Sequence, residues 1–331
     1  KKKFKGSLPY IFLAVTWIAW ERFYFDAEIS WPWLVLGNSF ARSTWAIQWY
    51  EYTGSLGGSL WIWACNLGLF GLLVSLSDGR FFDWNGKAKA ASLFGYAALL
   101  LIPFAISPVI GRQYADSMNE GEQLSVLIVQ PNIDPYNKFQ ALTQEQQNAI
   151  LLDYAEKSLE QRKNDSTASP LLVLAPETFT RDIIPGEYQR SRTWRRFTNF
   201  LKDYPGVSML FGASSYDYIL NEQRPSHTAR PVGDGLWVES HNSALTINGN
   251  SDTEIFHKSK LVVAVEKTPY PAIFCKIDDM LGGVMGRCVG QDEISLLHVN
   301  GCNGETIPVG CAVCYESVYG EYYTDYIRKG A

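Results

Sequence analysis

The sequence predicts an α-helical transmembrane bundle followed by an α/β domain. Two runs without any charged residue, 57–77 and 90–110, each have the roughly 20 residues that a helix needs to cross a bilayer. Tryptophan is concentrated in the same front part, where nine of the 11 tryptophans lie within the first 84 residues. Behind this part, short aliphatic runs and a helical pattern follow one another, as is typical of a layered α/β sheet.

Two further segments of the front part are less regular. Residues 8–20 are uncharged but short, and a helix there extends through Phe25 if Glu21 and Arg22 face the interior of the bundle. Residues 29–41 are interrupted by a proline and a glycine, which predicts a re-entrant or interfacial segment instead of a full span.

Positive charge predicts the orientation of these helices. Lysines and arginines gather before the first helix and between the two long runs, at Lys1, Lys2, Lys3, Lys5, Arg80, Lys87 and Lys89. The stretch between the first helix and the run at 57–77 holds only Arg42. Because loops rich in lysine and arginine stay in the cytoplasm, the three helices run in-to-out, out-to-in and in-to-out. We therefore expect a transmembrane region over 1–111 and a domain outside the cytoplasm over 112–331.

Composition narrows the possible functions. A net charge of -5 and a pI of about 5.5 give no electrostatic footprint for nucleic acid. The six cysteines lack the spacing of a disulfide scaffold, and no His-x-x-x-His accompanies the Cys-x-x-Cys, so we expect no metal and no cofactor. The chain begins without a methionine and stops in mid-pattern, so we expect a fragment of a longer protein, truncated at both ends.

The rear domain is predicted as strands and helices in succession. A helix is expected over 143–161, and strands over 124–133, 170–178, 207–216, 241–248 and 308–317. Polar residues follow several of these strands. A layered α/β sheet with its site at the strand ends is therefore expected.

Three segments of this domain end in a reactive side chain. "LAPET" carries Glu177, "HKSKL" carries Lys258 and "GCAVCYES" carries Cys314. Each has an ordinary explanation by itself, as a solvated turn residue, a surface lysine or a buried thiol. Their combination indicates a nucleophilic site.

These motifs resemble the signatures of the nitrilase, or carbon–nitrogen hydrolase, superfamily, whose triad is Glu, Lys and Cys. Together with the membrane front and with "PWLVLG", "VQPNI", "NSAL" and "HKSKLV", they make the chain similar to the apolipoprotein N-acyltransferase family over nearly its whole length. The resemblance implies a nitrilase-like α-β-β-α sandwich for the rear domain. It also implies a multi-pass enzyme of the bacterial inner membrane, with its catalytic domain on the periplasmic side.

The resemblance further implies a reaction and a set of residues. An acyl chain would pass from a phospholipid to the α-amine of an S-diacylglyceryl-cysteine lipoprotein, through a thioester on the cysteine and without nucleic acid as a partner. The implied catalytic residues are Glu177, Lys258 and Cys314, and the implied substrate-binding or supporting residues are Glu266, Tyr315, Glu316 and Phe139. Glu266 keeps its place although "LVVAVE" lacks the proline that is usual in the family, and Phe139 stands where the family often has tryptophan.

Elementary chemistry supports the same roles. A nearby ammonium group such as Lys258 should lower the pKa of the Cys314 thiol. Glu177 can take the thiol proton and later activate an amine. Lys258 and a backbone N–H after Cys314 should stabilise the negative oxygen of the tetrahedral intermediate. Cys311 is expected within the strand, on the face opposite Cys314, as a packing residue.

Alternatives stay open. A membrane-tethered nitrilase-type amidase would hydrolyse a C–N bond with water in place of the amine, and a catalytically inactive membrane scaffold is a further reading. A redox pair of Cys311 and Cys314 is disfavoured, because positions three apart on a strand point to opposite faces. Residues 267–290 mix apolar side chains with glycines and form either a packed loop or a lid that admits acyl chains.

Overall fold

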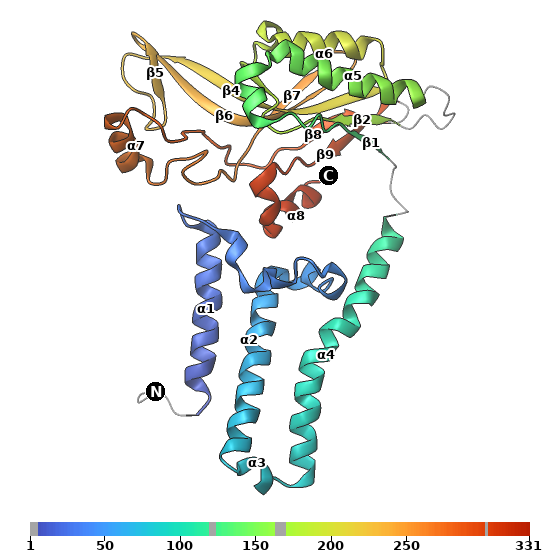
Figure 1. Cartoon of the computed structure of the whole chain (residues 1–331), viewed down its shortest axis with the longest axis vertical. Helices are drawn as coiled ribbons and strands as arrows, with labels where there is room; N and C mark the ends of the chain where they lie inside the picture. The colour runs from blue at the N-terminus through green and yellow to red at the C-terminus, as the bar shows by residue number, and fades with distance from the viewer. Residues whose placement is uncertain (1–5, 119–123, 163–169, 302–303) are drawn as a thin grey trace. The chain divides into compact units, whose positions relative to one another are not determined.

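The computed structural model describes residues 6–118, 124–162, 170–301 and 304–331. The chain divides into two compact units, Lys1–Glu122 and Gln123–Ala331 (Figure 1). The first unit is helical and the second is built on a mixed β-sheet. A helical front part and an α/β rear part are therefore confirmed.

The first unit contains the longer helices α1 (Leu8–Asp26), α2 (Tyr50–Ser77) and α4 (Gly86–Ser117), with the short α3 (Arg80–Asp83) between the last two. The turns η1 (Pro32–Leu34), η2 (Leu36–Phe40) and η3 (Thr44–Ala46) connect α1 to α2. Among the described residues, α2 and α4 are the two helices long and apolar enough to cross a membrane. Helix α1 is not in this group, so a third span stays a prediction.

The charged pair on α1 divides between two environments. Glu21 is buried, and its Oε1 accepts hydrogen bonds from Trp17 Nε1 at 2.8 Å and from the backbone N–H of Leu36 at 2.9 Å. Arg22 is about half exposed and pairs with Asp26 one turn later. The helix does extend past Phe25, to Asp26, although of the two charged residues only Glu21 is buried.

The segment over 29–41 folds as turns against the start of α2. A Cβ on Gly37 would lie 1.8 Å from the carbonyl oxygen of Ser55, so only glycine allows this approach. The N–H of Gly37 donates to Ser59 Oγ at 3.0 Å, and Tyr50 donates its hydroxyl proton to the carbonyl oxygen of Gly37 at 2.9 Å. These bonds satisfy a stretch of backbone that lies outside regular helix.

A tryptophan of α2 donates a hydrogen bond to a carbonyl group that a proline leaves without its helical partner in α4. Pro103 has no N–H, so the carbonyl group of Leu99, one turn earlier, loses its helical partner. Trp61 of α2 donates its indole N–H to that carbonyl oxygen at 2.7 Å. The two apolar helices are thereby joined by a hydrogen bond in a region where water would be scarce.

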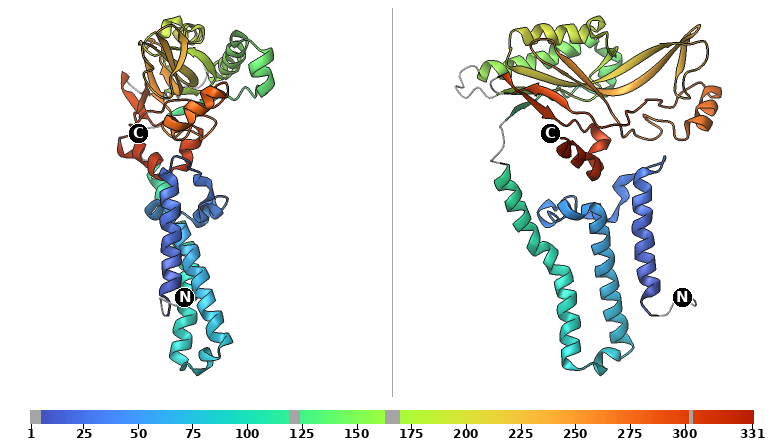
Figure 2. Two further views of the ribbon diagram at one scale, coloured as in Figure 1. Left: turned by 90° about the vertical axis from the view of Figure 1, so that its left-hand side faces the viewer. Right: turned by 180° about the vertical axis from the view of Figure 1, so that it is seen from behind.

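The second unit is built on a sheet of seven strands (Figures 1 and 2). They are β1 (Ser125–Ile128), β2 (Leu171–Leu174), β3 (Thr180–Ile183), β4 (Val207–Leu220), β5 (Arg230–Gly233), β6 (Leu236–Ile247) and β7 (Thr253–His257). The order is β1-β2-β4-β6-β5, with β3 paired to β4 and β7 paired to β6. Strands β1, β2 and β4 are parallel, and β6 is antiparallel to β4 and to β7. A two-stranded sheet of β8 (Leu297–Asn300) and β9 (Thr306–Val309) completes the strands.

Helices α5 (Gln144–Arg162) and α6 (Arg192–Lys202) cover one face of the large sheet, and the small sheet covers the other (Figure 1). Two further helices of this unit are α7 (Pro271–Met280) and α8 (Gly320–Arg328). One core joins α5 and α6 to the sheet through side chains such as Leu151, Phe197 and Phe211. The other joins Leu210 and Phe256 of the large sheet to the β8–β9 sheet. Figure 1 shows these layers, which make a mixed α/β sandwich. A complete nitrilase-like α-β-β-α order stays a prediction.

The strand predicted over 308–317 is shorter than expected. Strand β9 ends at Val309, and η7 (Cys314–Val318) begins five residues later. Cys314 has a φ of 50°, which a strand cannot accommodate. Cys311 therefore lies in the connection between β9 and η7, and the prediction that it sits inside a strand is wrong.

Candidate active site

The three predicted catalytic side chains come from three separate ends of secondary structure. Glu177 lies in the turn after β2, Lys258 follows the last residue of β7, and Cys314 opens η7. The hydrogen bond from Lys258 Nζ to Glu177 Oε1 is 3.3 Å long, and the Cys314 thiol lies within hydrogen-bond reach of Glu177. The structure thus brings these side chains together, although 137 residues separate the first from the last in sequence.

The turn that carries Glu177 lies directly on β4. The N–H of Gly212 donates to the carbonyl oxygen of Pro176 at 3.1 Å, and the N–H of Phe179 donates to the carbonyl oxygen of Gly212 at 2.8 Å. Thr178 has a φ of 46°, an uncommon conformation for a β-branched residue. A Cβ on Gly212 would lie 2.5 Å from the Cα of Glu177, so glycine is required where the turn crosses the strand.

Lys258 is a fully buried cation between two carboxylates. Its Nζ donates to Glu266 Oε1 at 2.9 Å and to Glu177 Oε1 at 3.3 Å. Burial alone would lower the pKa of Lys258. The hydrogen bond to Glu266 and the negative charges of Glu177, Glu266 and Cys314 outweigh burial, so the pKa is raised. The ammonium form is therefore the resting state of this side chain.

Asn242 of β6 is a site residue that the sequence analysis did not single out. Its Nδ2 donates to Glu177 Oε1 and to Glu266 Oε1, each at 2.7 Å. Asn242 is the first residue of the "NSAL" motif, which contributes to the family resemblance. Its role depends on hydrogen bonds to side chains that are distant in the sequence, and a local sequence pattern cannot predict such contacts.

Glu316, which is buried, and Glu266, which is partly buried, bind the loops around this centre through hydrogen bonds. Glu266 Oε2 accepts a hydrogen bond from the N–H of Val262 at 2.7 Å. Glu316 accepts from the N–H groups of Ser259 at 2.7 Å and Val313 at 2.8 Å. Burial raises the pKa of Glu316, and the backbone hydrogen bonds oppose this without cancelling it. Glu316 thereby ties the loop that follows Lys258 to the loop that carries the cysteine.

Cys314 is exposed at a sharp turn, with a left-handed backbone conformation. Burial of its thiol within the site and the charge of Glu177 raise the pKa of Cys314, while the charge of Lys258 and the N–H of Tyr315 lower it. The net direction is upward. The charge of Lys258 acts in the expected direction, but burial and the charge of Glu177 outweigh it, so the pKa of Cys314 lies above its ordinary value.

The remaining predicted residues have structural surroundings of different kinds. Cys311 packs against the core between the two sheets, and burial with the charges of Glu316 and Glu177 raises its pKa to about 12. Tyr315 is 1% exposed, and its ring meets the ring of Tyr319 edge-on at 5.3 Å, which makes it a packing residue of η7. Phe139 belongs to η4 (Asn137–Ala141), and its side chain lies outside the described residues.

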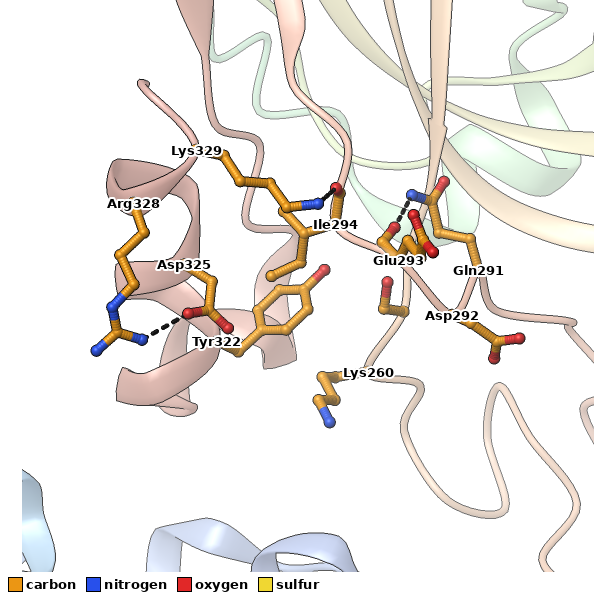
Figure 3. Close-up of a pocket in the computed structure, with 10 residues that line it drawn as sticks. Lys260, Gln291, Asp292, Glu293, Ile294, Tyr322, Asp325, Arg328 and Lys329 are labelled. Carbon is orange, nitrogen blue, oxygen red and sulfur yellow. Dashed lines mark hydrogen bonds and ion pairs between the residues drawn. The ribbon is translucent and has the colours of Figure 1, made fainter.

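A cavity of about 510 Å³ opens on the loop that follows Lys258 (Figure 3). Its wall is polar and carries both charge signs, from Ser259, Lys260, Gln291, Asp292, Glu293, Ile294, Tyr322, Asp325, Arg328 and Lys329. Lys260 faces this cavity, and its Nζ lies 5.3 Å from the ring centre of Tyr319. Lys260 and Lys258 therefore occupy different environments despite their closeness in sequence.

The close approach of Gly212 predicts a stability effect. In Gly212→Ala the new methyl group would overlap the backbone of Glu177 and Thr178, so we expect a loss of about 1–3 kcal/mol in the free energy of unfolding. Gly206→Ala is the matched control, because a Cβ there meets open space. Thermal denaturation followed by circular dichroism compares the two variants, and equal midpoints would contradict the packing argument.

Comparison with known proteins adds to this geometry. No family model matches the chain. Over 98% of its residues the chain is 23% identical to the apolipoprotein N-acyltransferase of Chlorobaculum tepidum, of which it spans 57%. Over 120 residues, 34% of the chain, it is 26% identical to the apolipoprotein N-acyltransferase of Thermotoga maritima, of which 23% is covered. The chain therefore spans little more than half the length of the first of these relatives. These similarities confirm the resemblance to the apolipoprotein N-acyltransferase family that the motifs of the chain predict.

Proposed function

We propose that this chain carries the acyl-transfer site of a lipoprotein N-acyltransferase. An acyl chain from a phospholipid forms a thioester with Cys314 and then passes to the α-amine of an S-diacylglyceryl-cysteine. The observation that carries the proposal is the exposed Cys314 on its strained turn, beside Glu177 and the buried ammonium group of Lys258. The two named relatives share this general activity in their names.

The first half-reaction begins with a protonated thiol, because the pKa of Cys314 is raised. Glu177 takes the thiol proton as Sγ attacks the ester carbonyl carbon, so the thiolate forms only when the donor is in place. We assign stabilisation of the negative oxygen to the ammonium group of Lys258, which pairs with Glu177, and to the N–H of Tyr315, which faces the thiol. The intermediate collapses to the thioester, and the alcohol of the lysophospholipid leaves with the proton that Glu177 returns.

The second half-reaction uses the same groups in reverse order. The α-amine of the lipoprotein attacks the thioester carbonyl, and Glu177 accepts a proton from the nitrogen. The C–S bond breaks, the new amide leaves, and Cys314 regains its proton from Glu177. One carboxylate thus serves both steps, which suits its position next to the thiol with a side chain 34% exposed.

The loop over 267–290 supports a lipid substrate. Helix α7 buries Asp278 and Cys275, and it exposes the apolar side chains of Ile273, Phe274, Ile277, Met280 and Leu281. The polar side is held by a buried ion pair between Asp278 and Arg287, at 2.5 Å. An ordinary packed loop would hide the apolar side instead, so we favour the lid that admits acyl chains. A small-amide hydrolase, the alternative, has no need of such a surface.

The location we propose is the bacterial inner membrane, with the second unit on the periplasmic side. Arg80, Lys87 and Lys89 lie at or next to the connection between α2 and α4, which favours a cytoplasmic position for that connection. A reporter enzyme that works only outside the cytoplasm should therefore be active when it is fused after Arg112. Fusion after Arg80 is the control and should give an inactive reporter. The opposite pattern would reverse the orientation and remove the lipoprotein from reach of the site.

Substitution of the two lysines of "HKSKL" should cause different losses of activity. Lys258→Met removes the buried ammonium group and should slow thioester formation by roughly 10²–10³-fold, as for one donor to a negative oxygen. Lys260→Met is the matched control, which loses ring contacts with Tyr319 and Tyr322 and should keep its rate within a few-fold. Single-turnover acylation from a phospholipid with a radiolabelled acyl chain measures both. A larger loss in the Lys260 variant would refute the assignment.

The thioester itself is the most direct prediction. Protein in detergent micelles, given labelled phospholipid and no amine, should accumulate label on Cys314 that neutral hydroxylamine releases. Cys314→Ala should trap no label. Cys311→Ala should still acylate, because its thiol has a pKa of about 12 and packs against the core.

Two results would count against the proposal. Label on Cys311, or undiminished activity in Cys314→Ala, would remove the nucleophile. Steady release of free fatty acid without an amine would mean that water resolves the thioester, and would favour the amidase-type alternative.

A further inference from the structure

Asn242 and Lys258 present their nitrogens to the same two oxygen atoms. Asn242 Nδ2 lies 2.7 Å from Glu177 Oε1 and 2.7 Å from Glu266 Oε1. Lys258 Nζ lies 3.3 Å and 2.9 Å from the same pair. Each carboxylate oxygen therefore receives one hydrogen bond from a cation and one from a neutral amide. The arrangement fixes the separation of Glu177 and Glu266 from two sides.

The charges show why a neutral donor belongs here. Two carboxylates share one ammonium group, so the cluster of Glu177, Glu266 and Lys258 carries one excess negative charge. A second cation in place of Asn242 would remove that excess and make Glu177 a poorer base. The amide instead supplies two N–H donors, which hold the carboxylates in place without neutralising them.

The other end of the side chain indicates that the amide is not kept for stability. Asn242 is 4% exposed, and among the described residues its Oδ1 is buried without a hydrogen-bond partner. A buried acceptor without a partner costs stability. Rotating the amide would place Oδ1 against two acceptor-only carboxylates, so the orientation is fixed. Asn242 therefore loses stability at its unpaired Oδ1, while its two N–H groups bind the two carboxylates.

We infer that Asn242 is a positioning residue for the acyl transfer. Its amide holds Oε1 of Glu177 against Glu266, which leaves the second oxygen of Glu177 for the Cys314 thiol. The inference rests on the proposed function, because positioning matters only if Glu177 moves the thiol proton. Among the described residues, the titratable or charged groups around this point include Glu177, Glu266, Lys258, Cys314, Cys288 and Cys311, with Lys138 beyond Glu177.

Two substitutions distinguish the effect of the N–H donors of Asn242 from the effect of the shape of its side chain. Asn242→Asp keeps the outline of the side chain but puts a third carboxylate against the other two. Asn242→Ala removes the donors and adds no charge. Single-turnover thioester formation, measured from pH 5.5 to 9.5, should fall roughly 10²-fold in Asn242→Ala, because the base is no longer held in line. Asn242→Asp should be slower still at high pH, and its deficit should shrink as the pH falls and the added carboxyl group regains a proton.

Alkylation of Cys314 by iodoacetamide gives a second measurement that needs no acyl donor. The charge of Glu177 raises the pKa of Cys314. If Asn242 holds Glu177 beside the thiol, its loss in Asn242→Ala should move the midpoint of alkylation to lower pH. The added charge in Asn242→Asp should move it to higher pH. Mass spectrometry of the peptide that contains Cys314 reports the reaction, and Asn199→Ala, an exposed asparagine of α6, is the control.

The outcomes are distinct. An Asn242→Asp variant with the wild-type rate and pH profile overturns the inference, since the shape alone would then suffice. Equal rates and equal alkylation midpoints in Asn242→Asp and Asn242→Ala overturn it too, since packing would then explain both. A wild-type protein that forms no thioester defeats the proposed function, while opposite shifts of the alkylation midpoint would still support the role of Asn242. If either variant fails to fold by circular dichroism, Asn242→Ser, which keeps one short donor, replaces it in both measurements.

Discussion

The second unit depends on one buried cation. The side chain of Lys258 is fully buried, and an ammonium group in such a place is tolerated only when ionised partners surround it. Glu177 and Glu266 provide those partners, and each arrives on a different loop. The demand for charge balance therefore fixes the turn after β2 and the connection after β7 relative to each other. Burial and the charge of Glu177 outweigh the effect of this cation on the neighbouring thiol, so the pKa of Cys314 is raised at rest.

A second constraint acts through the backbone. Gly212 lets the Glu177 turn lie on β4, and the positive φ values of Thr178 and Cys314 turn the chain sharply at the points where reactive side chains must leave it. Such conformations cost free energy and persist only where neighbouring structure holds them. Glu316 does part of this by accepting backbone hydrogen bonds from two loops at once. Packing in the two cores supplies the rigid support on which these strained points rest.

Sequence patterns predicted what depends on composition and on local order. The charge-free runs indicated the apolar helices α2 and α4, and the aliphatic runs indicated β2, β4 and β6. Contacts between distant segments were not predictable in this way. Arg22 found an exposed partner on its own helix, β9 ended before Cys311, and burial with the charge of Glu177 outweighed the effect of Lys258 on the pKa of Cys314. Asn242 was not predicted as a site residue for the same reason. The role of this strand asparagine depends on its hydrogen bonds to Glu177 and Glu266, which lie far away in the sequence.

The indole of Trp61 has a consequence for how the first unit can deform. A proline inside an apolar helix usually creates a hinge, because one carbonyl group loses its bond and the turns around it can bend apart. Here the freed oxygen of Leu99 is fastened to the neighbouring helix. Bending α4 at Pro103 would therefore break the hydrogen bond from Trp61. The hydrogen bond from Trp61 links α2 and α4 at the proline, so the proline does not act as a free hinge. We therefore expect the two helices to tilt together.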